Sequence, residues 1–90
     1  MSKYMIQKLQ TPISVALVFN HKKREVKPCK VMWEGRPYSI TKIGLHHTYR
    51  QGRTLFHVFS VESKELFFRL VLNTESLSWI VEEIADGESN

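Results

Sequence analysis

The sequence predicts an all-β fold: a single small antiparallel meander of about six strands, curled into a barrel or half-barrel. Two observations support this prediction. Short apolar stretches alternate with turn residues at intervals of roughly ten residues, a spacing typical of a strand meander. Within several stretches, large apolar residues occupy every second position, which is the period of a strand with one buried face. No layer of helices is predicted to cover that face, so the sheet must curl or pair with another copy.

The first half of the chain contributes three expected strands. Residues 13–19 are almost wholly apolar, and the polar link 20–27 follows them. The second strand covers residues 29–33 and ends at the turn signal Glu-Gly-Arg-Pro. The third strand begins at Tyr38. Its alternation shifts near Thr41–Lys42, which predicts a β-bulge, a device that lets a small sheet curl.

The second half begins with a basic, aromatic segment, His46–Arg53, which is expected to be a loop or an irregular hairpin tip with its bend at Gly52. The remaining expected strands are residues 55–61, 66–72 and 77–84. Residues 1–10 are ambiguous, because Ser2 could cap a short N-terminal helix. Residues 87–90 are expected to be a frayed tail. The whole chain, 1–90, is expected to be one domain.

The large side chains expected in the core are aromatic. They are Trp33, Tyr38, Phe59, Phe68 and Trp79. Burying one such side chain contributes roughly 1.5–3 kcal/mol to folding. Because a chain of 90 residues has a modest total stability, loss of Phe68 or Trp79 is expected to remove most of it.

Composition indicates the compartment. Cys29 is the only cysteine, so no intramolecular disulfide can form, which suits a reducing cytosol. The N-terminal residues lack the apolar stretch of a signal peptide, and the longest apolar run is too short to span a bilayer. The sequence therefore predicts a cytoplasmic protein without a membrane partner.

Three segments carry a family resemblance. They are Pro28-x-x-Val31-x-Trp33-x-Gly35-Arg36-x-Tyr38-x-Ile40, Val58-Phe59-x-Val61-Glu62 and Trp79-Ile80-Val81-Glu82-x-Ile84-x-Asp86. Together they resemble a family of small bacterial β domains of unknown function. Its members stand alone or are fused to the C-terminal end of translesion (Y-class) DNA polymerase proteins. The resemblance covers residues 13–86, and the chain departs from it where the family tends to carry a tryptophan and this sequence has His46 or His47.

The resemblance implies a β fold and, by association only, a link to DNA. It implies no catalytic residue, because the motif residues are those of packing and turns. The tip of the third strand, where the histidines replace a tryptophan, is the part of the chain about which the resemblance says least.

The histidines are the first candidates for a metal site. His46 and His47 are adjacent, and adjacent residues of a strand point to opposite faces. A zinc ion needs three or four ligands, so His21 and His57 would have to converge with one of the pair, with Cys29 as another candidate. Nothing in the spacing requires that, so the sequence predicts neither a metal site nor a cofactor.

No catalytic signature is present either. Cys29 lies in an expected strand and is interpreted as a packing residue. Glu82 and Glu83 are adjacent, are expected to diverge, and are interpreted as solvated charges on a sheet edge. The chain has no Ser-His-Asp arrangement and no glycine-rich phosphate loop. A non-catalytic protein is therefore expected. A concave pocket that collected His46 or His47, Cys29 and a carboxylate would favour an enzyme instead.

Charge gives the strongest indication of function. Residues 1–53 carry a net charge of +9, and residues 54–90 carry −5, within a total of +4. The candidate nucleic-acid-binding residues are Lys22, Lys23, Arg24, Lys42, Tyr49, Arg50 and Arg53. Cationic side chains neutralise phosphates and release counterions, and exposed aromatic rings stack on bases. The sequence thus favours a module that binds DNA or RNA, or docks onto a DNA-processing protein, through basic loops.

Two other interpretations stay open. The same charges could be ordinary solvated groups that keep a small domain soluble. The charge asymmetry and exposed strand edges could also serve a protein-interaction or self-associating domain with no nucleic-acid role. The sequence does not fix the oligomeric state.

Overall fold

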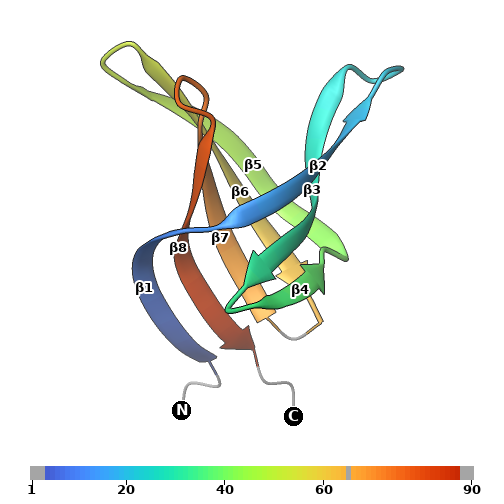
Figure 1. Ribbon diagram of the computed structural model, residues 1–90, viewed down its shortest axis with the longest axis vertical. Coiled ribbons are helices and arrows are strands. Elements are labelled where there is room, and N and C mark those ends of the chain that lie inside the picture. The colour runs from blue at the N-terminus through green and yellow to red at the C-terminus, as the bar shows by residue number, and fades with distance from the viewer. Residues whose placement is uncertain (1–3, 65, 88–90) are drawn as a thin grey trace.

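The computed structural model describes residues 4–64 and 66–87, and every regular element in them is a β-strand. The eight strands are β1 (Tyr4–Pro12), β2 (Ser14–Asn20), β3 (Glu25–Trp33), β4 (Arg36–Ser39), β5 (Lys42–Gln51), β6 (Thr54–Ser63), β7 (Leu66–Asn73) and β8 (Ser78–Gly87). They form two antiparallel sheets (Figure 1). The large sheet has the order β1-β8-β7-β6-β5, and the small sheet has the order β2-β3-β4. The described residues include no helix that could cross a membrane.

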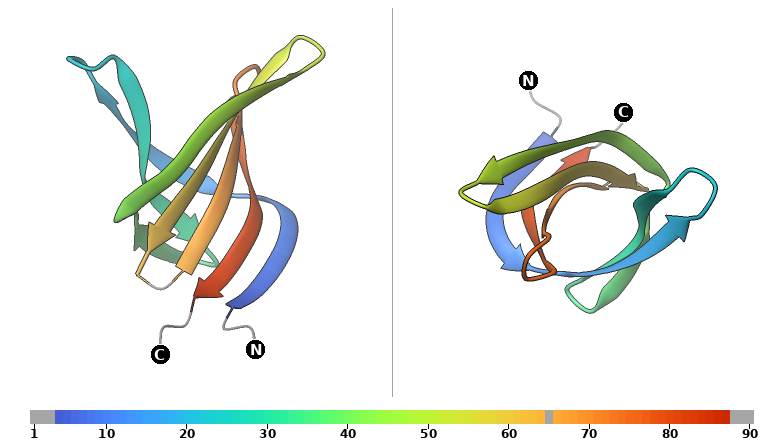
Figure 2. Two further views of the ribbon diagram at one scale, coloured as in Figure 1. Left: turned by 180° about the vertical axis from the view of Figure 1, so that it is seen from behind. Right: turned by 90° about the horizontal axis from the view of Figure 1, so that it is seen from above.

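The chain passes between the two sheets at two corners. At the first corner, between β1 and β2, the N–H of Ile13 donates to the carbonyl of Trp79 over 3.1 Å. At the second, between β4 and β5, the N–H of Ile40 donates to the carbonyl of Cys29, and the next N–H, that of Thr41, donates to Glu62. Neighbouring residues at this corner thus bond to different sheets. Corners of this kind let two sheets share one core, and the small sheet covers one side of the concave large sheet (Figure 2).

The core lies between the inner faces of the sheets. Its buried members are Val31, Phe59, Val61, Phe68, Leu70, Trp79, Val81 and Ile84. Only Val31 comes from the small sheet. The ring of Tyr38, also from the small sheet, meets Phe68 edge to face with a centroid distance of 5.7 Å. Of the five aromatic residues expected in the core, Phe59, Phe68 and Trp79 are buried, while Trp33 and Tyr38 are half-buried against it.

Tight turns set the strand registers. Between β3 and β4, Glu34 and Gly35 both have positive φ angles, of 51° and 77°, as a two-residue hairpin turn of type I′ requires. Between β5 and β6, Gln51 pairs with Thr54, and Gly52 has a φ of 63°, a value that glycine adopts without strain.

The all-β prediction is confirmed, but its details need correction. The structure has eight strands rather than six, and the two sheets do not join into a closed barrel. The short N-terminal helix is wrong for the described residues, because β1 pairs with β8 from Tyr4 onward. A strand at this position supplies hydrogen-bond partners for the backbone N–H and C=O groups of β8, whereas a helix of one or two turns is only marginally stable without tertiary contacts. Ser2 and residues 88–90 of the expected tail lie outside the described residues.

The segment His46–Arg53 is not an irregular loop. Its first six residues belong to β5, which forms a long regular hairpin with β6. The expected bulge near Thr41–Lys42 is displaced by a few residues. The break between strands falls at Ile40 and Thr41, and the register shift lies between Ile43 and Leu45.

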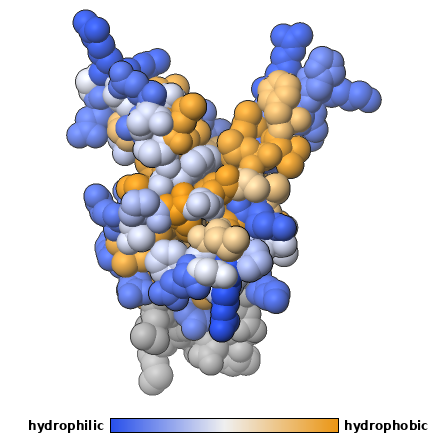
Figure 3. Space-filling view, in the orientation of Figure 1, coloured by the Kyte–Doolittle hydropathy of each residue, from blue (hydrophilic) through white to orange (hydrophobic). Residues whose placement is uncertain are grey.

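At one end of the molecule the two sheets diverge. The hairpin of β2 and β3 leaves the core on one side, and the hairpins of β5–β6 and β7–β8 leave it on the other (Figure 1). Side chains leave an open angle between these hairpins (Figure 3). We call this end of the molecule the open end.

Phe68→Ala should lower the free energy of unfolding by about 3–5 kcal/mol, because it leaves a large cavity in the core. Phe68 is 1% exposed, so nothing else can fill its volume without rearrangement. Urea denaturation followed by circular dichroism measures the loss. Phe19→Ala is the matched control: Phe19 is 62% exposed, and its loss should cost no more than about 0.5 kcal/mol. Equal effects of the two substitutions would contradict this assignment of the core.

Candidate functional site

A cleft of about 410 Å³ opens between the β2–β3 hairpin and the inner face of the large sheet. Its lining residues are Leu17, Arg24, Glu25, Val26, His46, His57, Phe59, Leu72 and Trp79. The first four come from the hairpin, whose outer part, residues 17–26, we call the arm. The other five come from β5, β6, β7 and β8. Figure 3 shows apolar residues gathered in the angle between the diverging hairpins, with polar residues at the hairpin tips.

The strand register explains the floor of the cleft. His57, Leu72 and Trp79 are paired in one row across β6, β7 and β8. Directly paired residues in antiparallel strands project from the same face of a sheet. His46 pairs with Phe59 in the next row toward the core. The cleft is therefore the outward continuation of the core, and its floor consists of the row of His57, Leu72 and Trp79 together with His46 and Phe59.

A register shift in the small sheet sets the opposite wall. Val15 pairs with Val31, but beyond Ala16 the pairing shifts by one residue, so that Leu17 pairs with Pro28. Cys29 is passed over, and the alternation of β3 changes phase. As a result Val26, rather than Lys27, shares a face with Leu17 and contributes to the cleft.

The arm exposes more apolar surface than a solvated hairpin needs. Leu17, Val18, Phe19 and Val26 are exposed, with Phe19 the most open of the four. Phe19 pairs with Val26, and Leu17 lies two residues from Phe19, so these three side chains share one face of the arm and form one patch, while Val18 points to the other face. Contiguous exposed apolar surface marks an interaction site more often than chance.

His46 and His57 form a hydrogen-bonded pair in the cleft. The Nε2 atom of His46 and the Nδ1 atom of His57 are 2.8 Å apart. The His46 ring also lies flat on Phe59, with centroids 4.1 Å apart and an angle of 13° between the planes. Both contacts hold the His46 ring in one orientation, parallel to the aromatic floor.

The pKa of His46 is lowered from its usual value of 6.5. Burial against the sheet is the largest cause, and the neighbouring His57 and His47 add to it, while Glu25 on the arm acts in the opposite direction. At neutral pH the His46 imidazole is therefore uncharged, and each ring of this kind has one nitrogen that donates and one that accepts.

The basic residues predicted to bind nucleic acid fall into two groups and two outliers. Lys22, Lys23 and Arg24 lie in the turn between β2 and β3, and Arg50 and Arg53 lie at the β5–β6 turn. We call these the two tips. They flank the open end from opposite sides (Figure 1).

The two outliers lie elsewhere. Lys42 begins β5 and is at the far end of that strand from Arg50. Tyr49 pairs with Phe56, stacked at 4.9 Å. Because its neighbour Thr48 pairs with His57, which faces the cleft, Tyr49 projects from the outer face of the sheet.

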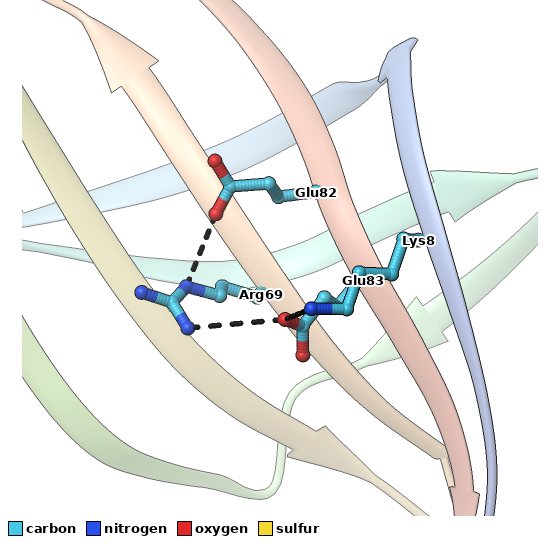
Figure 4. Close-up of polar contacts among 4 residues, drawn as sticks. All are labelled: Lys8, Arg69, Glu82 and Glu83. Atoms are coloured by element: carbon cyan, nitrogen blue, oxygen red, sulfur yellow. Dashed lines mark ion pairs between the residues drawn. The ribbon is translucent and has the colours of Figure 1, made fainter.

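The carboxylates of β8 form ion pairs with Arg69 and Lys8 (Figure 4), far from the tips. The Nε atom of Arg69 lies 3.1 Å from Glu82, and its Nη1 atom lies 4.0 Å from Glu83, which also pairs with Lys8 at 3.5 Å. The expectation that Glu82 and Glu83 are diverging edge charges is wrong. β8 lies between β1 and β7, and a register shift between Arg69 and Leu70 brings both carboxylates to one arginine.

Two carboxylates do lie at the open end. Glu25 pairs with Lys27 at 3.3 Å, and Glu75 accepts a hydrogen bond of 2.8 Å from the Thr54 hydroxyl. Within residues 4–64 and 66–87, none of the five cations of the tips forms an ion pair. At the β5–β6 tip, the Arg50 guanidinium donates to the Arg53 carbonyl over 3.5 Å.

The metal and enzyme candidates are only partly brought together. His57 does converge with His46, but the described residues contain no group of three or more His, Cys, Asp or Glu that could hold a metal ion. Cys29 is a half-buried free thiol that does not line the cleft. The cleft does collect two histidines and Glu25, yet absence of catalysis stays a prediction.

Comparison with known proteins adds no assignment: no protein-family model, no curated protein and no solved structure matches the chain. The resemblance to polymerase-associated β domains therefore stays a prediction.

Neither the cleft nor the histidine pair is predicted from the sequence, although the position of the β5–β6 turn is a signal for the pair. A two-residue turn at Gly52 and Arg53 pairs residue 51 with residue 54. Counting back from that turn makes His46 and His57 diagonal neighbours on one face. The apolar cleft has no such local signal, because it depends on how far the two sheets diverge.

In an NMR titration, the imidazole protons of His46 should show a midpoint below about 6.5, the ordinary value for histidine. The spectrum of His46→Gln assigns the signal. Because the folded-state pKa is below the unfolded value, the folded protein binds fewer protons, and His46 destabilises the fold as pH falls from the unfolded value toward the folded one. A midpoint at or above the ordinary value would contradict the burial and the pairing with His57.

Proposed function

We propose that this protein is a non-catalytic module that binds single-stranded nucleic acid at its open end. One observation carries the proposal: two cationic tips, which form no ion pair with any residue of the ranges 4–64 and 66–87, flank an apolar cleft with an aromatic floor. A cytoplasmic location agrees with this function and belongs to the same proposal.

The tips supply the attraction for phosphates. Lys22, Lys23 and Arg24 are exposed, as are Arg50 and Arg53. Exposed cations without carboxylate partners can neutralise phosphates and release the counterions that surround a polyanion. The carboxylates Glu82 and Glu83 pair with Arg69 and Lys8, away from the tips. Glu25 and Glu75 do lie at the open end, but two carboxylates offset only part of the charge of the five tip cations.

The cleft favours a single strand over a duplex. In a duplex, base faces are stacked and hidden, so an apolar concavity between two basic tips would have nothing to contact. A single strand presents both its phosphates and its base faces, and proteins that bind it combine cationic grooves with aromatic platforms. The arrangement of tips and cleft supplies both parts.

Fluorescence anisotropy with a labelled single-stranded oligonucleotide tests the proposal. Affinity should fall steeply with salt. Reversal of Lys22, Lys23 and Arg24 to glutamate should abolish measurable binding at physiological salt. The milder triple change to alanine should reduce the salt slope by about 2, because each lost contact to a phosphate of a single strand removes about 0.7.

Lys42→Glu is the matched control, because it changes the net charge by as much as each single reversal in the tip does, but at the other end of β5. It should leave affinity nearly unchanged. The proposal is wrong if no oligonucleotide binds at low salt, or if the Lys42 variant weakens binding as much as a single reversal in the tips.

A protein-interaction role is the second candidate, and the exposed apolar patch of the arm supports it. Leu17, Val18 and Phe19 lie on β2, an edge strand of the small sheet, and an exposed apolar edge can pair with another chain. Light scattering at rising protein concentration tests self-association. A dimer that Phe19→Lys returns to a monomer would favour this role, whereas a monomer at high concentration would count against it.

A further inference from the structure

We infer that the cleft receives one unstacked nucleobase, and that the His46–His57 pair contacts the hydrogen-bonding edge of that base. The inference rests on the proposed function, because it names which part of a single strand enters the cleft. It makes Leu17, Val26 and Trp79 the apolar contacts of the base and the two histidines its polar contacts.

The size of the cleft suits a single ring system. Its volume of about 410 Å³ lies at the lower end of the roughly 300–1,000 Å³ typical of small-molecule sites. A duplex or a folded peptide segment is too large for it. One base, still attached to a backbone that runs outside the cleft, is not.

The cleft has two apolar walls. On one side the wall is formed by Leu72, Trp79 and the His46 ring. Phe59 lies beneath His46 and 5.8 Å from Trp79, and so supports this wall from the core. On the other side stand Leu17 and Val26 of the arm. A flat aromatic group between these walls would remove apolar surface from water on both of its faces, and base–aromatic contacts are tolerant of base identity.

The histidine pair adds a polar edge with an unusual property. The bond between His46 Nε2 and His57 Nδ1 uses one nitrogen of each ring. Of the two nitrogens left over, one must donate and the other must accept, whichever ring donates within the pair. The pair therefore always presents one donor and one acceptor, and it can exchange them by shifting tautomers. Base edges offer complementary sets of donors and acceptors.

The lowered pKa of His46 supports this pattern but does not carry it. A protonated pair would present two donors and no acceptor. The charged or titratable groups near His46 are His57 and His47 on the large sheet and Glu25 and Arg24 on the arm. Burial and the two histidines outweigh Glu25 and lower the pKa of His46, so the His46 ring is uncharged at neutral pH.

Charge at the rim places the backbone of the strand. Arg24 lines the cleft itself, and Lys22 and Lys23 lie in the same turn. Phosphates next to an inserted base would lie at the rim of the cleft, where these cations are. An acidic peptide would match the cations and the apolar walls, but it must order several side chains to do so, whereas a nucleotide brings charge, flat surface and polar edge in one nearly rigid group.

Anisotropy titrations with a fluorescein-labelled oligothymidylate of about ten nucleotides, within the usual site size, test the inference. The comparison ligand is the same backbone with abasic residues throughout. It keeps every phosphate, so it should bind with the same salt slope but roughly 5- to 150-fold more weakly, the equivalent of one stacked base. His57→Phe should keep the preference for intact bases but change the ratio of affinities for oligothymidylate and oligocytidylate at least about fivefold.

His47→Phe is the matched control. His47 lies between His46, which lines the cleft, and Thr48 on strand β5, so its side chain projects from the opposite face of the sheet. It should change neither ratio. Equal affinity for intact and abasic strands, with the salt slope retained, would overturn the inference and leave the proposed function standing. No binding of either strand would end both. Binding of a Glu- and Phe-rich peptide in place of the oligonucleotides would assign the cleft to an acidic peptide and overturn the inference.

Discussion

The structure depends on the two corners at which the chain changes sheets. At each corner, backbone hydrogen bonds that a regular strand would form with one neighbouring strand are divided between the two sheets. The N–H of Ile13 bonds to the large sheet just before β2 begins, and the N–H groups of Ile40 and Thr41 bond to the small and the large sheet in succession. These bonds hold the small sheet over only part of the large one. The core fills the covered part, and the uncovered part becomes the cleft. A single geometric constraint therefore both stabilises the protein and leaves His57 and Leu72 of its inner face only half-buried at the open end.

The chemistry of the open end follows from strand register rather than from any local motif. His57, Leu72 and Trp79 meet because three strands are paired in step. Val26 joins Leu17 because the pairing of β2 and β3 shifts at Cys29. The cations are at the tips because both turns fall in basic segments of the sequence. Apolar surface, a donor–acceptor pair and positive charge are thus combined at one end, while the carboxylates of β8 are held by Arg69 and Lys8 elsewhere.

The sequence predicted what depends on local patterning. Alternating apolar residues gave the all-β class and most strands, and their large members Phe59, Phe68 and Trp79 are in the core. It failed where tertiary contacts decide. Residues 4–10 form a strand because β8 offers an unpaired edge, and Glu82 and Glu83 converge because of a bulge. The sequence identifies the basic residues of the tips, whereas two other candidate site residues, Lys42 and Tyr49, lie apart from them. The sequence does not predict the cleft, because the cleft arises from the divergence of two sheets.

The most direct test of the central claim, that ligands engage the open end, is chemical-shift mapping with a single-stranded oligonucleotide on isotopically labelled protein. The account predicts that perturbed amide and side-chain signals come from the arm, notably Leu17 and Val26, and from His57 and Arg53, while signals of Lys42 and Arg69 stay unchanged. Perturbations centred on the Arg69–Glu83 side or on the outer-face residue Tyr49, with the cleft silent, would contradict it.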